Sequence, residues 1–304
     1  MQKELIVLET PTIERCNPSN FFTENQMVQS IVDSFILELE QNISKDSLNI
    51  FYTNLKTLEI KIEDNIKEYI KLMFSKKYIT GSYDSRNNTL YATIPRDFNI
   101  INRNIMPEEE RLAVMYHELL HMSATILERY KDTKFSGFCQ VKDNQIGIAI
   151  NEGYIELLLH RLFYIRMKYI TYKYELHIAR NVERIVGHLR MTDLYFNADL
   201  YNLVGDLERY SNINRVEKFI DDFDTLYRLQ GEDKYFEEDI IHYHNDIIKF
   251  LIDTYQEKLD INLRNKIITH SECNRRFDDY LIRLDKASRT IGIEDGVKAL
   301  IRLR

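Results

Sequence analysis

Two apolar stretches of this chain each carry ionisable side chains spaced four residues apart. The first contains His117, Glu118 and His121, and the second contains Glu152 and Glu156. In an α-helix, residues four apart lie one turn above each other on the same face. Burying such groups without partners costs several kcal/mol for each ion. We therefore expect two helices that bring these side chains together.

A divalent cation between the two helices would remove this cost. Zinc fits best, because two imidazoles and one carboxylate leave the fourth position of its tetrahedral coordination open for water. Glu118 follows the first histidine by one residue, about 100° around the helix. It therefore lies near the metal without stacking on the histidine pair, and we expect it to act as a general base. The alternative is a core helix whose two histidines are merely hydrogen-bonded.

The H-E-x-x-H motif at residues 117–121, followed by the N-E-x-x-x-E motif at residues 151–156, resembles the gluzincins, the thermolysin-like zinc metallopeptidases. In that family the third zinc ligand is the glutamate of an Asn-Glu pair on a second helix. The resemblance implies His117, His121 and Glu152 as ligands of Zn²⁺. It implies Glu118 as the general base and gives Glu156 the place of an acidic residue that orients a ligand histidine.

The resemblance covers roughly residues 107–160, about a sixth of the chain. More loosely, residues 151–197 resemble small bacterial proteins that carry the same pair of motifs. The resemblance implies a zincin-like catalytic core, which we assign to residues 1–170. A helical C-terminal subdomain, residues 171–304, is expected to pack on this core.

The expected fold class is α+β and mostly helical, with a small antiparallel sheet before the active-site helix. Residues 78–83 and 89–94 predict a β-hairpin, because a turn rich in Asp, Asn and Ser separates them. In zinc peptidases of the type that the motifs resemble, a strand beside the metal helix lines the cleft. The edge of this hairpin is thus a candidate site for an extended peptide, and an ordinary structural hairpin is the alternative.

Hydrophobic spacing predicts the remaining elements. No proline follows Pro107, which indicates long helices and short connections in the C-terminal half. The expected helices are residues 23–39, 46–55, 65–74, 107–127 and 150–170, the expected strand is 58–62, and 131–147 is expected to be a polar loop. From residue 171 onward the chain is expected to be helical, with breaks near Gly187, Asn197, Ser211-Asn212 and Gly231.

Peptide hydrolysis develops negative charge on the substrate carbonyl oxygen, and gluzincins offset it with a tyrosine or histidine donor. Tyr174, Tyr195 and His188 are candidates for this role because they follow the metal helices. The chain has 20 tyrosines, so each candidate also fits a purely structural role. The sequence does not decide among the three.

Other histidines and a run of basic residues have simpler interpretations. His160 could be a fourth ligand, but that would close the open position that catalysis needs, so we favour a histidine at the helix end. His242 and His244 diverge on a helix and are expected at the surface. A solvated basic face, or a patch that steers acidic peptides, is expected from Arg161, Arg166, Lys168, Lys173, Arg180 and Arg184.

Composition restricts the compartment and the partners. The net charge of −7 disfavours nucleic acid and anionic membranes as partners. No apolar run approaches the length of a membrane span, and the N-terminus does not resemble a signal peptide. Cys16, Cys139 and Cys273 are too scattered for a disulfide scaffold or a thiolate zinc site. The cytoplasm is the expected compartment, and a leaderless secretion route stays open.

The leading hypothesis for function is a zinc metallopeptidase that acts on a peptide or protein substrate. A second hypothesis is a catalytically silent zincin-fold protein that binds or regulates a partner. The intact Glu118 argues against this second hypothesis, because a purely structural zinc site needs no base beside its ligands. A non-peptide amide hydrolase would share the chemistry and differ only in the shape of its pocket. Oligomeric state and cleavage specificity are not readable from the sequence.

Overall fold

The computed structural model describes residues 26–63, 81–93, 108–130, 133–141, 145–230, 237–293 and 297. This part is mostly helical with two small sheets, so the predicted α+β class is confirmed. The helices are α1 (Gln26–Asn42), α2 (Asn49–Leu55), α5 (Glu108–Ser123), α6 (Ile148–Leu162), α7 (Lys173–Val186), α8 (His188–Phe196), α9 (Leu200–Glu208), α10 (Ile213–Gln230), α11 (Glu237–Arg264) and α12 (His270–Thr290), with 3-10 turns η2 (Lys45–Leu48) and η3 (Met167–Tyr169). The strands are β1 (Glu59–Glu63), β2 (Gly81–Asp84), β3 (Thr89–Thr93), β4 (Thr125–Tyr130), β5 (Thr133–Ser136), β6 (Cys139–Val141) and β7 (Gln145–Ile146).

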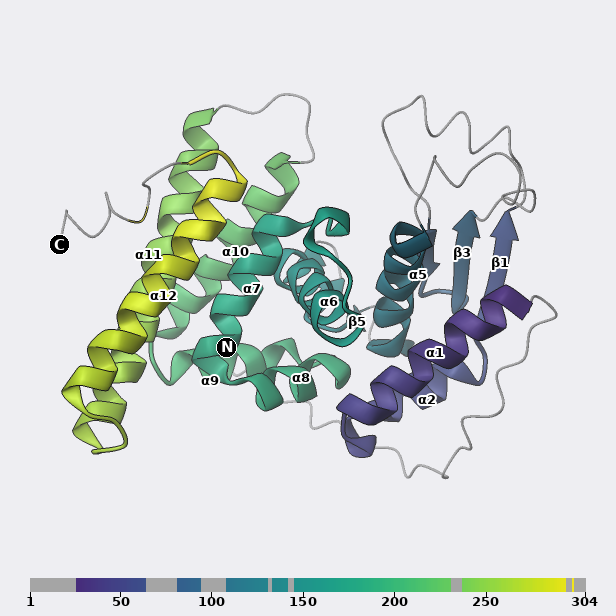
Figure 1. Ribbon diagram of the computed structural model, residues 1–304, viewed down its shortest axis with the longest axis horizontal. Helices are drawn as coiled ribbons and strands as arrows, with labels where there is room; N and C mark the ends of the chain where they lie inside the picture. Colours follow the sequence, from purple (N-terminus) through teal and green to yellow (C-terminus); the bar gives the residue numbers. More distant parts are fainter. Residues whose placement is uncertain are drawn as a thin grey trace.

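A three-stranded sheet with the order β1-β3-β2 lies on one side of α5 (Figure 1). β2 and β3 form the predicted antiparallel hairpin, and β1, the predicted strand at 58–62, pairs parallel with β3. The turn is built as its composition indicates: Asp84 accepts a hydrogen bond from the backbone N–H of Arg86, and Asn88 adopts a positive φ of 49°. The predicted helix at 65–74 lies outside the described residues.

The prediction of a polar loop at residues 131–147 was wrong. β4, β5, β6 and β7 form a second, antiparallel sheet of four strands between the two ligand helices. These strands are two to six residues long, so their alternation gave no recognisable signal in the sequence.

The first metal helix ends at Ser123, earlier than the expected residue 127. Side chains take up the backbone carbonyls that an α-helix leaves without partners at its end. Ser123 donates to the carbonyl of Leu120, and Asn54 of α2 donates to the carbonyls of Met122 and Thr125. These contacts allow the chain to turn directly into β4.

The helix α6 lies at the centre of the molecule and is buried on nearly all sides, as expected for a helix that is apolar all round (Figure 1). It packs against α5 on one side and against α7 and α10 on the other. It ends at Leu162 instead of residue 170 because Tyr164 takes a left-handed conformation with φ 55°, and the N–H of Ile165 bonds back to the carbonyl of Leu159. A residue in the left-handed conformation just after the last helical turn is a common way for a helix to end.

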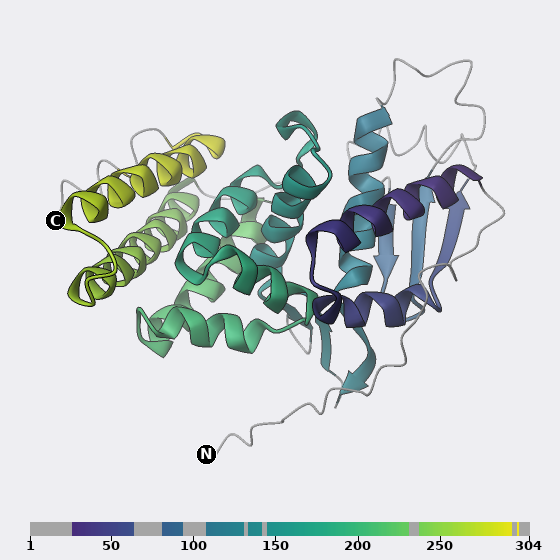
Figure 2. The same cartoon turned by 60° about the horizontal axis from the view of Figure 1, so that its bottom comes forward.

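The helices from α7 onward form the other half of the molecule. The predicted breaks near Gly187, Asn197 and Ser211-Asn212 separate α7, α8, α9 and α10, whereas Gly231 lies outside the described residues. α11 and α12 form an antiparallel pair at the end farthest from the three-stranded sheet (Figure 2). No helix among the described residues is long and apolar enough to cross a membrane. The predicted boundary at residue 170 stays a prediction.

Candidate metal centre

His117, His121 and Glu152 converge on one point between α5 and α6. The Nε2 atoms of the two histidines are 3.2 Å apart. One carboxylate oxygen of Glu152 lies 3.2 Å from Nε2 of His117, and the other lies 3.4 Å from Nε2 of His121. Among the residues that the structure describes, these three are the group of His, Cys, Asp and Glu side chains with a spacing suited to a metal ion.

The spacing of these groups suits a zinc ion. With bonds of about 2.0–2.1 Å from zinc to nitrogen or carboxylate oxygen, tetrahedral geometry places two ligand atoms about 3.3–3.4 Å apart. The two Nε2 atoms, 3.2 Å apart, lie close to that value, and each oxygen of Glu152 lies at a similar distance from one of them. The donor set of two imidazoles and one carboxylate also suits zinc. The residues therefore fit the ion that the sequence predicts.

Glu152 is placed by a helix whose first turn is capped from elsewhere in the chain. α6 has no capping side chain of its own, because its N-cap is Gly147 with φ 79°. Asp224 of α10 accepts hydrogen bonds from the backbone N–H groups of Gly147 and Ala149, at 2.6 and 2.9 Å. A carboxylate at a helix N-terminus satisfies unpaired donors and complements the helix dipole. Asp224 thus fixes the start of the helix on which Glu152 lies.

The centre strongly favours positive charge. Burial alone would lower the pKa of His117, but a hydrogen bond to Glu152 and the negative charges of Glu152, Glu156 and Glu118 outweigh it and raise the pKa to about 9. Burial opposes ionisation of Glu152, yet the charge of His121 and hydrogen bonds from both histidines hold the pKa of this carboxyl well below its usual range. A divalent cation bound between these side chains would likewise be stabilised by their negative charges.

Glu156 lies one turn beyond Glu152, behind the ligand His117. Its Oε1 is 3.7 Å from Nδ1 of His117, which is longer than a hydrogen bond, and it accepts weak hydrogen bonds from the N–H groups of Thr171 and Tyr172. Its Oε2 is buried with no partner, and burial followed by the charge of Glu152 raises the pKa of this carboxyl. Metal-bound histidines usually donate their second N–H to a carboxylate, and the orienting role that the resemblance implies for Glu156 stays a prediction.

Glu118 is half-buried and, within the described part of the chain, forms no hydrogen bond or ion pair. Its charge nevertheless acts on the pKa values of His117 and Tyr172, which places it beside both. A carboxylate that is near the metal ligands but not held by another group is available to accept a proton.

None of the three oxyanion candidates from the sequence directs its polar group at the ligands. Tyr174 is buried, and its hydroxyl lies 3.1 Å from Nδ1 of His244. The buried Tyr195 donates to the carbonyl of Leu120 and supports α5 from behind. His188 lies 3.0 Å from a carboxylate oxygen of Glu183. Their polar atoms are engaged in the packing of the helical half.

Tyr172 and Tyr227 lie beside the candidate ligands instead, and neither is among the tyrosines predicted from the sequence. The ring of Tyr172 is 6.0 Å from that of His117, and the ring of Tyr227 is 5.6 Å from that of Tyr172. Burial and then the charge of Glu152 raise the pKa of Tyr172 to about 12, and the same two causes raise the pKa of Tyr227 further. Tyr172 immediately precedes α7, so its position after the metal-binding motifs made it as good a candidate as Tyr174. Tyr227 lies on α10, and nothing in the sequence around it indicates that it approaches the site.

Two of the remaining histidine predictions hold and one was wrong. Nδ1 of His160 donates to the carbonyl of Ile165, 3.0 Å away, at the end of α6, so it does not join the three candidate ligands. His242 is exposed as predicted. His244 was predicted at the surface but is fully buried against Tyr174, because the helix α11 turns this side toward α7 and α10.

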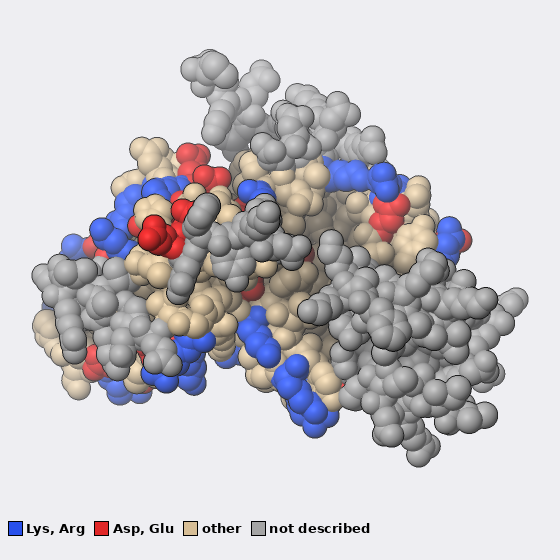
Figure 3. Space-filling model, turned by 90° about the horizontal axis from the view of Figure 1, so that it is seen from above, with Lys and Arg blue, Asp and Glu red and all other residues tan. Residues whose placement is uncertain are grey.

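Seen from above, the surface is hollowed between the half that carries α5 and the half that carries α7 and α12, with Lys and Arg side chains at the edges (Figure 3). The ligand helices α5 and α6 meet between these two halves. Comparison with protein-family models, with curated proteins and with solved structures finds no match to this chain. The resemblance to gluzincins therefore rests on the motif residues and on the site geometry derived from them.

Proposed function

We propose that this chain is a zinc-dependent metallopeptidase that hydrolyses peptide bonds. The observation that carries the proposal is the convergence of two histidine nitrogens and the carboxylate of Glu152, with Glu118 beside them and bonded to none of the described residues. His117, His121 and Glu152 would hold the ion. A zinc ion at that position supplies a polarised water molecule and a Lewis acid for the substrate carbonyl.

Three side chains supply proton transfer and hydrogen-bond donation in this proposal. Glu118 accepts a proton from the attacking water and returns it to the leaving amine, so it serves as base and then as acid. Tyr172 and Tyr227 replace the candidates that the sequence indicated as hydrogen-bond donors to the developing oxyanion. Their raised pKa values keep both hydroxyls protonated near neutral pH, as a donor requires.

The substrate in this proposal is a peptide or protein, met in the cytoplasm. Cys139 and Cys273 are both free, which agrees with a reducing compartment. β2 is an edge strand of its sheet among the described strands and contacts α5. An extended peptide could therefore add to it beside the metal helix.

The test combines metal analysis with cleavage of a degenerate peptide library by the wild type and by Glu118→Gln. We expect one zinc ion per chain in both proteins and loss of cleavage in the variant. Glu217→Gln, which removes an exposed carboxylate on α10, is the matched control and should retain activity. Wild-type protein that binds no zinc, or a Glu118→Gln variant that still cleaves at the wild-type rate, would overturn the proposal.

A further inference from the structure

A second cluster of charged side chains, which the proposed peptidase does not use, lies between α7 and α12. His177, Arg180 and Arg184 recur at spacings of three and four on α7, so they share one face of that helix. Arg283 and Lys286 are three residues apart on α12. We call these five residues the α7–α12 cluster.

The packing of the helices brings the two parts of the cluster together. α12 lies along α7 (Figure 1), and the hydroxyl of Tyr280 donates to the carbonyl of Asn181 at 3.4 Å. Lys258 of α11 donates to the carbonyls of Arg184 and Ile185, both at 2.7 Å, and places another cation at the end of α7. Three helices thus contribute cations to one region.

The arginines of the cluster form no ion pair among the described residues, although the charges of Glu183 and Asp279 act on Arg180 and Arg184 respectively. Arg180, Arg184 and Arg283 are half-buried and form no ion pair, and Nε of Arg283 is buried without a hydrogen-bond acceptor. The nearby Glu183 is already bonded to Arg161 and His188. A buried donor without a partner is rare in folded proteins and indicates a missing water or ion.

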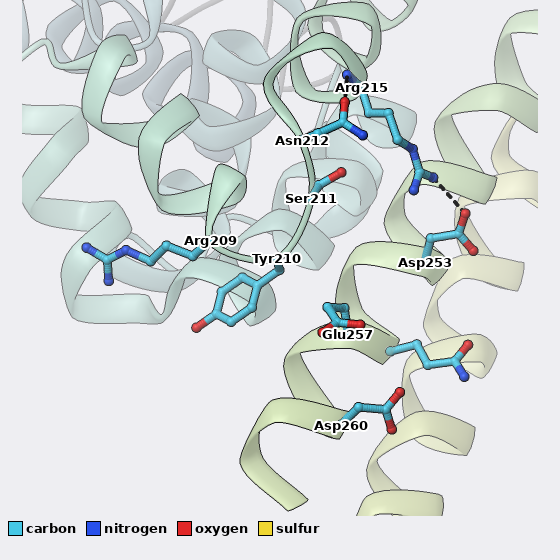
Figure 4. A pocket seen from close by; sticks show the side chains of 9 residues that line it. Arg209, Tyr210, Ser211, Asn212, Arg215, Asp253, Glu257 and Asp260 are labelled. Carbon is cyan, nitrogen blue, oxygen red and sulfur yellow. Dashed lines mark hydrogen bonds and ion pairs between the residues drawn. The ribbon is translucent and has the colours of Figure 1, made fainter. Parts of the chain in front are cut away.

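Several arginines elsewhere in the same half are paired with carboxylates, in contrast to those of the cluster. A groove of about 580 Å³ between the start of α10 and α11 shows the contrast (Figure 4). There Arg215 bonds to Asp253 at 2.6 Å, and Arg209 lies 2.9 Å from a carboxylate oxygen of Asp206. Both arginines of this groove therefore have a carboxylate partner, whereas those of the cluster form no ion pair.

The cations of the cluster are close enough to act on one another. Burial and then the neighbouring Arg161 and Arg283 lower the pKa of Arg180, and burial and Arg283 lower that of Arg184. Burial, followed by the charges of Arg180 and Lys286, lowers the pKa of His177 to about 4, so its imidazole is neutral at pH 7. Repulsion within a compact cationic group falls when an anion binds.

We propose that the α7–α12 cluster binds a phosphate group of a small molecule. Three half-buried guanidinium groups offer the planar pairs of N–H donors that match phosphate oxygens. The cluster is compact, since residues 177 to 184 span about 10 Å along α7, and the chain as a whole carries a net charge of −7. Both features favour a small phosphate compound over a nucleic acid or a membrane, which would require an extended basic surface.

The inference is tested by titrating the full-length protein with inorganic phosphate, tripolyphosphate and ATP in a calorimeter at constant ionic strength. We expect saturable binding to the wild type. Arg180→Gln and Arg283→Gln should each weaken it about tenfold or more, because each removes charge-assisted hydrogen bonds. Arg275→Gln, which removes an exposed and unpaired arginine of the same helix, is the matched control and should bind like the wild type.

The comparison of ligands identifies the source of the phosphate group. ATP that binds more tightly than tripolyphosphate would indicate a nucleotide, and equal affinities would indicate the phosphate groups alone. Nuclear magnetic resonance of His177 gives an independent readout, since a bound anion should raise the pKa of this imidazole. Absence of saturable binding to the wild type, or equal loss in Arg275→Gln and Arg283→Gln, would overturn the inference. Tighter binding to an RNA oligomer than to all three compounds would also overturn it.

Discussion

Replacement of Glu175 by glutamine should stabilise the metal-free protein, increasingly so as the pH rises. Glu175 lies in the first turn of α7, is only 2% exposed, and its Oε1 has no hydrogen-bond partner. Burial and then the charges of Glu152 and Glu156 raise the pKa of this carboxyl from 4.5 to about 7, against a smaller opposing effect of its own backbone N–H. The folded state therefore holds the proton more tightly than the unfolded state does.

The sign and size of the effect follow from this difference. Because the pKa is higher in the folded state, the stability that Glu175 contributes is present below about pH 4.5 and is lost as the pH rises through about 7. Each pKa unit corresponds to about 1.4 kcal/mol, so ionising this side chain in the folded state costs about 3 kcal/mol. Glutamine resembles the protonated carboxyl in shape and does not ionise, so it should avoid this cost.

The assay is urea unfolding of both proteins in the presence of a chelator, at several pH values between about 5 and 9. The free energy of unfolding should be nearly equal for the two proteins at the lower limit, and the variant should be more stable by about 3 kcal/mol at the upper limit. Glu217→Gln removes an exposed carboxylate and should show no such trend. A constant difference between Glu175→Gln and the wild type across this range would refute the reasoning.

Three further predictions test the proposed site and the helices that support it. Tyr172→Phe and Tyr227→Phe should each lower kcat for peptide cleavage by about 100-fold at unchanged zinc content, since each removes a donor to the oxyanion; full activity in both would exclude that role. Gly153→Ala should reduce the free energy of unfolding by about 3 kcal/mol, because a Cβ there would lie 2.2 Å from a backbone oxygen of α7. Gly205→Ala meets nothing within 4 Å and should be neutral or slightly stabilising in the same thermal or urea assay. Asp224→Ala leaves two N–H groups at the start of α6 without acceptors. It should therefore lower the free energy of unfolding by about 2 kcal/mol and weaken zinc binding. Unchanged zinc affinity in a calorimeter would contradict the positioning role of Asp224.

The parts of the site that depend on local spacing could be predicted from the sequence. The i and i+4 spacing of the histidines fixes their common face on any helix, and the cost of burying Glu152 requires a positively charged neighbour. Those arguments predict that the two helices meet, and the resemblance of the two motifs to gluzincins adds Glu152 as the third ligand beside His117 and His121; the structure brings the three side chains together. The hairpin before α5 was likewise predictable, because its turn residues and alternation are local signals.

The parts that depend on packing between distant segments could not be predicted. Tyr227 reaches the centre only because α10 packs against α6, and no property of its own neighbourhood indicates this. The burial of His244 has the same origin. The strands β4 to β7 are two to six residues long and are held by pairing with one another, so they carry little alternation of their own. Tyr172 was missed because a sequence does not reveal which residues at the start of α7 lie beside the candidate ligands.

The capping of α6 by Asp224 of α10 limits how short a fragment can be and still form the proposed metal centre. A fragment ending at residue 170 would retain the three proposed ligands and Glu118, yet it would lose the carboxylate of Asp224, which accepts hydrogen bonds at the start of α6. The isolated N-terminal segment should therefore contain all the proposed metal-binding groups. Without Asp224, however, the start of α6 should be less well fixed, so the positions of these groups should be less well suited to zinc. A design that places this centre in another scaffold therefore has to include the equivalent of Asp224 in addition to the two motifs.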